Sequence, residues 1–197
     1  MSKLYIEHFI RNCNLEIRNY FLMFSDPEHN IQQLNIPDGS IVVDFGSGGG
    51  YYTLESAKRA GERGKVYAID IQKELLKKIK IEANDLGLKN IETIWADIEK
   101  KGGTKLKDGL AGVGIVANVM FLAGDKNAFA EEVARVVKAG GKILIVDWTD
   151  SWKGIGPSKE HVVKKEDMRK LFENHGFLYE KDIDAGDHHF GFIMRKR

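Results

Sequence analysis

The chain has 197 residues, and its 30 Lys and Arg against 29 Asp and Glu give a formal net charge of +1. This near balance excludes a bulk electrostatic attraction to nucleic acid or to an anionic membrane. Apolar residues make up 43% and aromatic residues 10% of the chain, which is typical of a globular protein, and the single Cys13 excludes an internal disulfide and a multi-thiolate zinc site.

The first 36 residues predict a helical segment that stands apart from the rest. Its apolar residues follow the spacing of one helical face: Ile6, Phe9, Ile10, Cys13, Ile17, Phe21 and Phe24. Charged residues interrupt this stretch, so no signal-peptide core is expected, and Pro27 and Pro37 are expected to break the helical pattern beyond Phe24. We predict a cap, a lid or an oligomer interface over 1–36, a separate domain over 37–197, and a cytoplasmic protein without stable membrane association.

From residue 40 onwards, short β-branched runs alternate with amphipathic runs. Strands are predicted over 40–45, 65–69, 91–95, 112–118 and 142–146. Helices are predicted over 52–60, over 72–86, from the N-cap Asp125 through Val137 to the stop signals Gly140 and Gly141, and over 166–175. Nearly continuous apolar strands alternating with helices indicate an α/β, Rossmann-like, doubly wound parallel sheet.

The chain ends in two strand-like runs, 177–183 and 188–194, without a helix between them. A connection of only four residues, 184–187, favours a hairpin and therefore an antiparallel last strand.

Polar side chains are found where four of the predicted strands end. They are Asp44, Asp70, Asp97 and Asn118. Ligands of open α/β sheets bind beyond these carboxyl ends, so the four side chains predict a binding site. A glycine-rich turn, 46–50, comes after the first strand and lets a ligand approach the backbone closely, and the donors there favour a carboxylate or another anionic group.

The spacing of this turn distinguishes between nucleotide ligands. A dinucleotide site would read G-x-G-x-x-G, but Tyr51 stands at the third glycine position after Gly46 and Gly48. Asp44 lies two residues before the first glycine, where a carboxylate disfavours a pyrophosphate and suits a ligand with an ammonium group. Gly64-Lys65 lacks the remainder of a phosphate-binding P-loop.

Four stretches, in this order, resemble the class I S-adenosylmethionine-dependent methyltransferases. VVDFGSGGGYYT is similar to their glycine-rich first motif, VYAID to their second and ADIE to their third. ANVMF with FAEEVARVVKAGGKILIVDW resembles the fourth-strand to fifth-strand segment of the UbiE-like and generic small-molecule members. The resemblance covers about residues 30–197 and implies a mostly parallel seven-stranded sheet with an antiparallel last strand.

The resemblance implies that S-adenosyl-L-methionine is held by residues at the ends of the first four strands: Asp44, Gly46, Ser47, Gly48, Gly50, Asp70, Ile71, Ala96, Asp97, Ile98 and Asn118. Asp44 and the glycine turn would hold the methionine part, and Asp70 would accept hydrogen bonds from both ribose hydroxyls. Ile71 would pack on the adenine, and Asp97 would accept from its amine. Asn118 would face the departing methyl group.

The implied reaction is in-line methyl transfer to a small or medium-sized acceptor, leaving S-adenosyl-L-homocysteine. Orientation supplies most of such catalysis, and a base is needed only where the acceptor must lose a proton. Quinone carbon, lipid and protein-lysine acceptors stay open. Arsenite methylation is disfavoured by the single thiol, and no nucleic-acid partner is expected, because Val119-Met120-Phe121 after Asn118 departs from the N/D-P-P-Y pattern.

Two other classes stay open. One is an NAD(P)-dependent oxidoreductase, weakened by the missing third glycine and by the absence of a Tyr-x-x-x-Lys pair. The other is a protein that binds S-adenosylmethionine without turnover, which the lack of an evident catalytic base allows.

The acceptor side is predicted after the fifth strand. Candidate lining residues are Trp148, Thr149 and Trp152, with Tyr5, Phe9, Tyr20, Phe21 and Phe24 as a lid. A histidine, His161, His188 or His189, could serve as a base because histidine titrates near neutrality. Adjacent strand residues point to opposite faces, so His188 and His189 are not expected to share a metal ion with Asp184 and Asp187.

Overall fold

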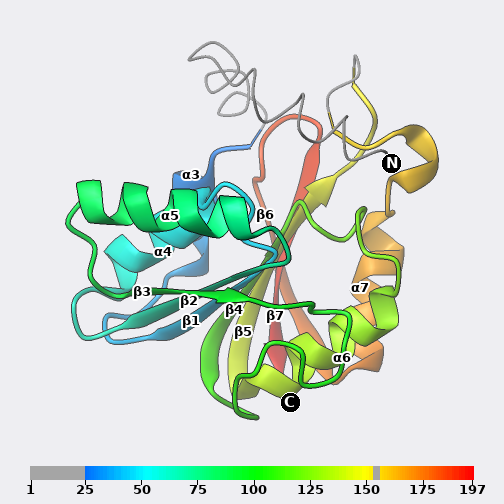
Figure 1. The fold of residues 1–197 in the computed structure, drawn as a ribbon. Helices are drawn as coiled ribbons and strands as arrows, with labels where there is room; N and C mark the ends of the chain where they lie inside the picture. Colours follow the sequence, from blue (N-terminus) through cyan, green and yellow to red (C-terminus); the bar gives the residue numbers. More distant parts are fainter. Residues whose placement is uncertain (1–24, 153–155) are drawn as a thin grey trace.

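One sheet of seven strands in the order β3-β2-β1-β4-β5-β7-β6 organises the computed structural model, which describes residues 25–152 and 156–197 (Figure 1). The strands are β1 (Ile41–Phe45), β2 (Lys65–Asp70), β3 (Ile91–Trp95), β4 (Ala111–Ala117), β5 (Val137–Trp148), β6 (Phe177–Ile183) and β7 (His189–Lys196). β1 to β5 pair in parallel, and β7 is antiparallel to both β5 and β6. The predicted fold class is therefore confirmed, hairpin included.

Helices cover both faces of this sheet. They are α3 (Pro27–Leu34), α4 (Tyr51–Ala60), α5 (Lys73–Asp85), α6 (Lys126–Val136) and α7 (Lys165–Asn174), with a 3-10 turn η1 (Lys159–His161). Figure 1 shows α3, α4 and α5 on one face and α6 and α7 on the other. Phe129 and Phe172 are buried in the core on the side of α6 and α7. Ile31 and Leu144 are buried in the core on the opposite side of the sheet. Within the described ranges, no helix has the length and apolar character that a membrane crossing needs.

α3 begins where the sequence was expected to break. Pro27 occupies the first turn, where a helix needs no N–H from that residue, and Asp26 caps the helix by accepting from the backbone N–H groups of Glu28 (2.9 Å) and His29 (3.3 Å). The expected break is therefore present at Ser25 and Asp26, but a helix follows Pro27, because Asp-Pro is a helix start. The helix and the lid expected over residues 1–24 lie outside the described residues.

The junction of α6 and β5 also differs from the prediction. Asp125 caps α6 as expected, through its carboxylate and the N–H of Ala128 at 2.9 Å. The helix ends at Val136, however, and Val137 is extended and pairs with Ala111 of β4. The two glycines expected to stop the helix lie inside β5. The β-branched Val137 is better accommodated in the sheet, where it is fully buried.

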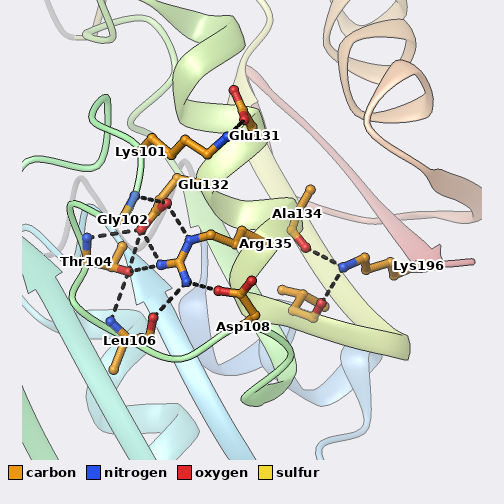
Figure 2. Close-up of polar contacts among 11 residues, drawn as sticks. Lys101, Gly102, Thr104, Leu106, Asp108, Glu131, Glu132, Ala134, Arg135 and Lys196 are labelled. Atoms are coloured by element: carbon orange, nitrogen blue, oxygen red, sulfur yellow. Dashed lines mark hydrogen bonds and ion pairs between the residues drawn. The ribbon is translucent and has the colours of Figure 1, made fainter.

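A buried polar network holds the connection between β3 and β4 against α6 (Figure 2). The Glu132 carboxylate accepts from the hydroxyl (2.6 Å) and N–H (3.0 Å) of Thr104 and from the N–H of Gly102 (2.8 Å). Arg135 donates to Glu132 (2.7 Å) and to the carbonyl of Leu106 (2.8 Å). Burial alone would raise the pKa of Glu132, but these hydrogen bonds outweigh it and lower that pKa to about 2.

Candidate cofactor and acceptor site

Asp44, near the carboxyl end of β1, is a buried carboxyl group next to the glycine turn. Its side chain is enclosed, with the residue 2% exposed, and its Oδ2 accepts from the Thr53 hydroxyl of α4 at 2.6 Å. Burial raises the pKa of Asp44 to about 7, and the nearby charge of Asp70 acts in the same direction. A cation bound beside Asp44 would reverse this shift, so the group is suited to an ammonium ligand.

The turn between β1 and α4 requires its glycines. Gly46 has a φ of 84°, and a Cβ there would lie 2.4 Å from Cγ2 of Val119. Gly50 has a φ of 88°, and a Cβ there would lie 2.6 Å from Cγ1 of Ile79. The hydroxyl of Ser47 is buried in this turn and has no hydrogen-bond partner among the described residues. A buried hydroxyl of this kind needs a ligand or an ordered water to satisfy it.

Asp70 at the end of β2 ties two segments together. Its Oδ2 accepts from the N–H of Gly48 in the turn (2.9 Å), and its Oδ1 accepts from the N–H of Gln72, the N-cap residue of α5 (2.8 Å). Burial raises the pKa of Asp70, although these hydrogen bonds favour its charged form. A carboxylate has about four acceptor positions, so the group can still accept from a further donor.

Ile71 and Trp95 form an exposed apolar edge beside Asp70. They are 62% and 53% exposed, and the indole Nε1 of Trp95 donates to the carbonyl of Ile71 at 2.9 Å. The ammonium of Lys73 lies 3.8 Å from the centroid of the Trp95 ring. Trp95 was not among the predicted site residues, and its hydrogen bond to Ile71 arises from the parallel pairing of β2 and β3.

Asp97 lies just after β3 and is only half-buried. Its Oδ1 accepts from the N–H of Glu99 (3.0 Å), and its Oδ2 pairs with Lys100 (3.1 Å). Ala96 and Ile98 on either side are each 7% exposed and belong to the core facing α6. The N–H of Ala96 donates to the backbone carbonyl of Asp70 at 3.2 Å, so the ends of β2 and β3 lie side by side.

Asn118 comes directly after β4 in a left-handed conformation, with a φ of 53°. Its N–H donates to the carbonyl of Val146 in β5 (2.8 Å), while its Oδ1 is buried and finds no partner within the described ranges. Asp147 supports the loop after Asn118, because its Oδ2 accepts from the N–H of Met120 (3.2 Å) and its Oδ1 from the N–H of Trp148 (2.8 Å). Burial raises the pKa of Asp147 to about 7.

Asp147 was not predicted as a site residue, although it stands at a strand end as the other acids do. The hydrogen bond between Asp147 and Met120 joins the ends of two strands that are distant in sequence, so the pattern of residues around Asp147 could not reveal this role.

The candidate histidines have different partners. His188 contacts Asp150 after β5, Nδ1 to Oδ1 at 2.9 Å, and its ring lies 5.3 Å from that of Trp152. His189 Nδ1 contacts the backbone carbonyl of Asp187 (3.0 Å), and its ring packs against Trp148 with centroids 4.2 Å apart. His161 instead contacts the hydroxyl of Ser158, a residue that precedes η1, at 2.6 Å. The two neighbouring histidines therefore do not converge on one point.

The sheet order, the antiparallel β7 and the acids at three successive strand ends define a class I S-adenosylmethionine-dependent methyltransferase fold. The family model described as "Methyltransferase domain" matches residues 36–184, and the chain belongs to this family.

Relatives agree with this family. The ubiquinone/menaquinone biosynthesis C-methyltransferase UbiE of Shewanella frigidimarina is 28% identical over 160 residues, which are 80% of this chain and 60% of that protein. The protein of the same name from Paraburkholderia phymatum is 31% identical over 122 residues, 62% of this chain and 49% of that protein. The chain thus spans only about half to three-fifths of these relatives. A crystal structure of a SAM-dependent methyltransferase from Aquifex aeolicus has a TM-score of 0.78 at 30% identity and covers 88% of this chain and 90% of its own.

Proposed function

We propose that this protein binds S-adenosylmethionine at the ends of β1 to β4 and transfers its methyl group to a small-molecule acceptor. The observation that carries the proposal is the arrangement of Asp44, Asp70 and Asp97 at three adjacent strand ends around a turn in which a Cβ at either Gly46 or Gly50 would clash. Membership of the methyltransferase family supports the same conclusion.

The unsatisfied polar groups of the site match this cofactor. The hydroxyl of Ser47 and the amide oxygen of Asn118 are buried without partners among the described residues, as expected where a polar ligand supplies them. Asp44 is a buried carboxyl group whose charged form a ligand ammonium would stabilise. The residues present therefore fit a cofactor that is cationic at one end and polar in the middle.

Each residue then has a distinct role in the proposal. Asp44 and the glycine turn hold the amino-acid end, and Asp70 accepts from the ribose hydroxyls. Ile71 packs on the adenine with Trp95 beside it, and Asp97 accepts from the adenine amine with Ala96 and Ile98 as neighbours. Asn118 orients the methyl-bearing end.

The cofactor supplies a methyl group on a positively charged sulfur, which is already a strong electrophile. The protein's part is therefore to hold an acceptor atom in line with that methyl group. Orientation of this kind is worth about 7–11 kcal/mol of barrier. Asp44 and Asp70 are buried and hydrogen-bonded to neighbouring elements, so they fix the cofactor end of this alignment rigidly.

A reduced quinone ring is the acceptor class to test first. The supporting observations are that the UbiE relatives are C-methyltransferases and that the ring of Trp152, four residues beyond the end of β5, lies beside His188, where an aromatic side chain suits a planar acceptor. No comparable observation supports a protein lysine as the acceptor.

Calorimetric titration tests the cofactor half of this proposal. Wild type, Asp70→Ala and the matched control Asp85→Ala, an exposed acid at the end of α5, are titrated with S-adenosylmethionine, S-adenosylhomocysteine and NADH. Micromolar binding of the first two ligands by wild type and the control, lost in Asp70→Ala, is the expected result. Binding of NADH instead, or of no ligand, would refute it.

Methyl transfer tests the other half. Wild type with labelled S-adenosylmethionine is incubated anaerobically with 1,4-naphthohydroquinone, a simple phenol, a thiol and a primary amine. Label is expected on the ring carbon of the hydroquinone. Binding of the cofactor without label in any product would leave a non-catalytic binding protein.

A further inference from the structure

Asp150 and His188 form a side-chain pair that joins two segments on the acceptor side. Nδ1 of His188 lies 2.9 Å from Oδ1 and 3.0 Å from Oδ2 of Asp150, which stands two residues beyond the end of β5. His188 comes just before β7 and has a left-handed backbone with a φ of 60°, a conformation that costs energy for a residue with a Cβ. The contact ties the turn before β7 to the segment after β5.

The strand register places this pair at the same sheet edge as Asn118. Trp148 of β5 is opposite His189 of β7, and the N–H of Thr149 donates to the carbonyl of His188 at 2.9 Å. Asn118 is hydrogen-bonded to β5 on the other side. Two strand spacings, about 10 Å, separate the end of β4 from the start of β7, so an acceptor that reaches from the methyl-donor side to His188 would lie over the end of β5.

The contact fixes which ring nitrogen of His188 is basic. An ionised carboxylate can only accept hydrogen bonds, so Nδ1 facing Asp150 must carry the proton. The neutral imidazole then has its lone pair on Nε2. Asp150 thereby fixes the orientation and the tautomer of the ring, as in other histidine bases held by an acid.

We propose that His188 is the base that removes the acceptor's proton during methyl transfer, with Asp150 as its positioning residue. This inference rests on the proposed function. With a hydroquinone acceptor, Nε2 of His188 takes the hydroxyl proton as the ring carbon attacks. The new C–C bond forms while the S–CH₃ bond breaks, and the sulfur keeps the electron pair. The ring carbon then loses its proton to solvent, and the imidazolium of His188 returns its proton to the oxygen, which restores the hydroxyl. One proton is therefore released for each methyl group transferred, and it balances the positive charge lost from sulfur.

Few titratable groups surround His188 among the described residues. Asp150 faces it from the segment after β5, and its chain neighbours are Asp187 and His189. His189 is engaged elsewhere, by the carbonyl of Asp187 and the ring of Trp148. Trp152 contributes only an aromatic ring to the surroundings.

Nitrogen-15 NMR of the histidine rings tests the dyad without an acceptor. In the neutral form of wild type, the His188 proton is expected on Nδ1. In Asp150→Asn, the amide can donate to Nδ1, so the proton is expected to move to Nε2 and the basic lone pair is lost. A wild-type protein with the proton on Nε2 of His188 would overturn the proposal, whatever the acceptor.

Anaerobic kinetics with 1,4-naphthohydroquinone test the base. General-base catalysis contributes about 10²–10⁴-fold, so His188→Asn should lower kcat by at least about 10²-fold and remove the acidic limb of the pH–rate profile. Asn tolerates the left-handed backbone, which protects the fold. Asp150→Asn should lower kcat with an unchanged KM for S-adenosylmethionine. The matched control His29→Gln, from a surface pair with Asp184 at 3.7 Å, should behave as wild type.

The outcomes separate the two proposals. An active wild type whose rate and pH profile survive in His188→Asn would overturn the base assignment and leave the methyltransferase standing. A wild type that methylates no acceptor would overturn the proposed activity, and the base assignment with it, while the NMR result would still decide the Asp150–His188 geometry.

Discussion

Cofactor affinity should depend on pH through Asp44. The carboxyl group is 2% exposed, and its burial raises the pKa to about 7 in the cofactor-free protein. If the ligand ammonium pairs with ionised Asp44, binding below pH 7 must first remove a proton from that carboxyl. From pH 7 to pH 5 the dissociation constant should then rise about 50-fold, or ~2 kcal/mol. The ammonium itself stays charged in this range, because α-amino groups titrate at about 7.7–8.0.

Isothermal titration with S-adenosylhomocysteine at pH 5, 6 and 7 measures this slope. At pH 6, repeating the titration in buffers of different ionisation enthalpy should show release of about one proton per bound ligand. S-adenosylhomocysteine has the ammonium but lacks the sulfonium, so its slope reports on the amino-acid end alone.

Two variants show whether Asp44 is the titrating group. Asp44→Asn should bind more weakly at pH 7 and lose the pH dependence. It should also stay folded and, without ligand at pH 8, be more stable than wild type, since a carboxyl with a raised pKa loses stabilisation as pH rises through that pKa. Asp147→Asn, which removes the other buried acid with a pKa of about 7, should keep the wild-type slope. A flat affinity in wild type, or an unchanged slope in Asp44→Asn, would refute the reasoning.

Three smaller effects test other parts of the site and fold. Asp97→Ala should weaken S-adenosylmethionine binding about tenfold by calorimetry, the value of one hydrogen bond to a charged group, and unchanged affinity would remove Asp97 from the site. Gly46→Ala should lower the free energy of unfolding more than Gly48→Ala, because both have a positive φ but only the first places a Cβ against Val119; equal losses in urea titrations would contradict the steric argument. Glu132→Gln should lower the free energy of unfolding by about 3 kcal/mol at pH 7. The folded pKa of Glu132, about 2, lies below the ordinary 4.5, so the stability difference between this variant and wild type should shrink by about 2 kcal/mol at pH 3. A stability difference that does not change with pH would show that the ionised form of Glu132 is not what stabilises the network.

The strand-end positions of the proposed cofactor residues were predictable because their signals are local. A β-branched run ending in an acid beside a turn places Asp44, Asp70 and Asp97 at strand ends without knowledge of any partner. The same locality explains why β1, β2 and β3 were predicted within one residue of their observed bounds. The N-cap Asp125 belongs to this group as well, since a cap needs only the residues directly after it.

The features that were missed depend on distant contacts. β5 begins at Val137 because Ala111 of β4 pairs with it, and a helical pattern that included Val137 could not show this. Asp147 acquires its role from the loop after β4, and Asp150 from a histidine 38 residues further along the chain. The pairing of Asp150 arises only when β7 is inserted antiparallel beside β5.

The topology of the sheet explains this division. The proposed cofactor half lies at the ends of β1 to β4, where each strand contributes one polar side chain. The proposed acceptor half lies where β5 meets the β6–β7 hairpin, and the Asp150–His188 pair spans that junction. The loop after β5 and the hairpin turn can change in sequence without altering the β1 turn, because they share no hydrogen bond with Asp44 or Asp70 among the described residues. We therefore expect methyl-donor binding and acceptor choice to vary independently: exchanging the 149–158 loop between relatives should change the acceptor and leave the affinity for S-adenosylmethionine intact.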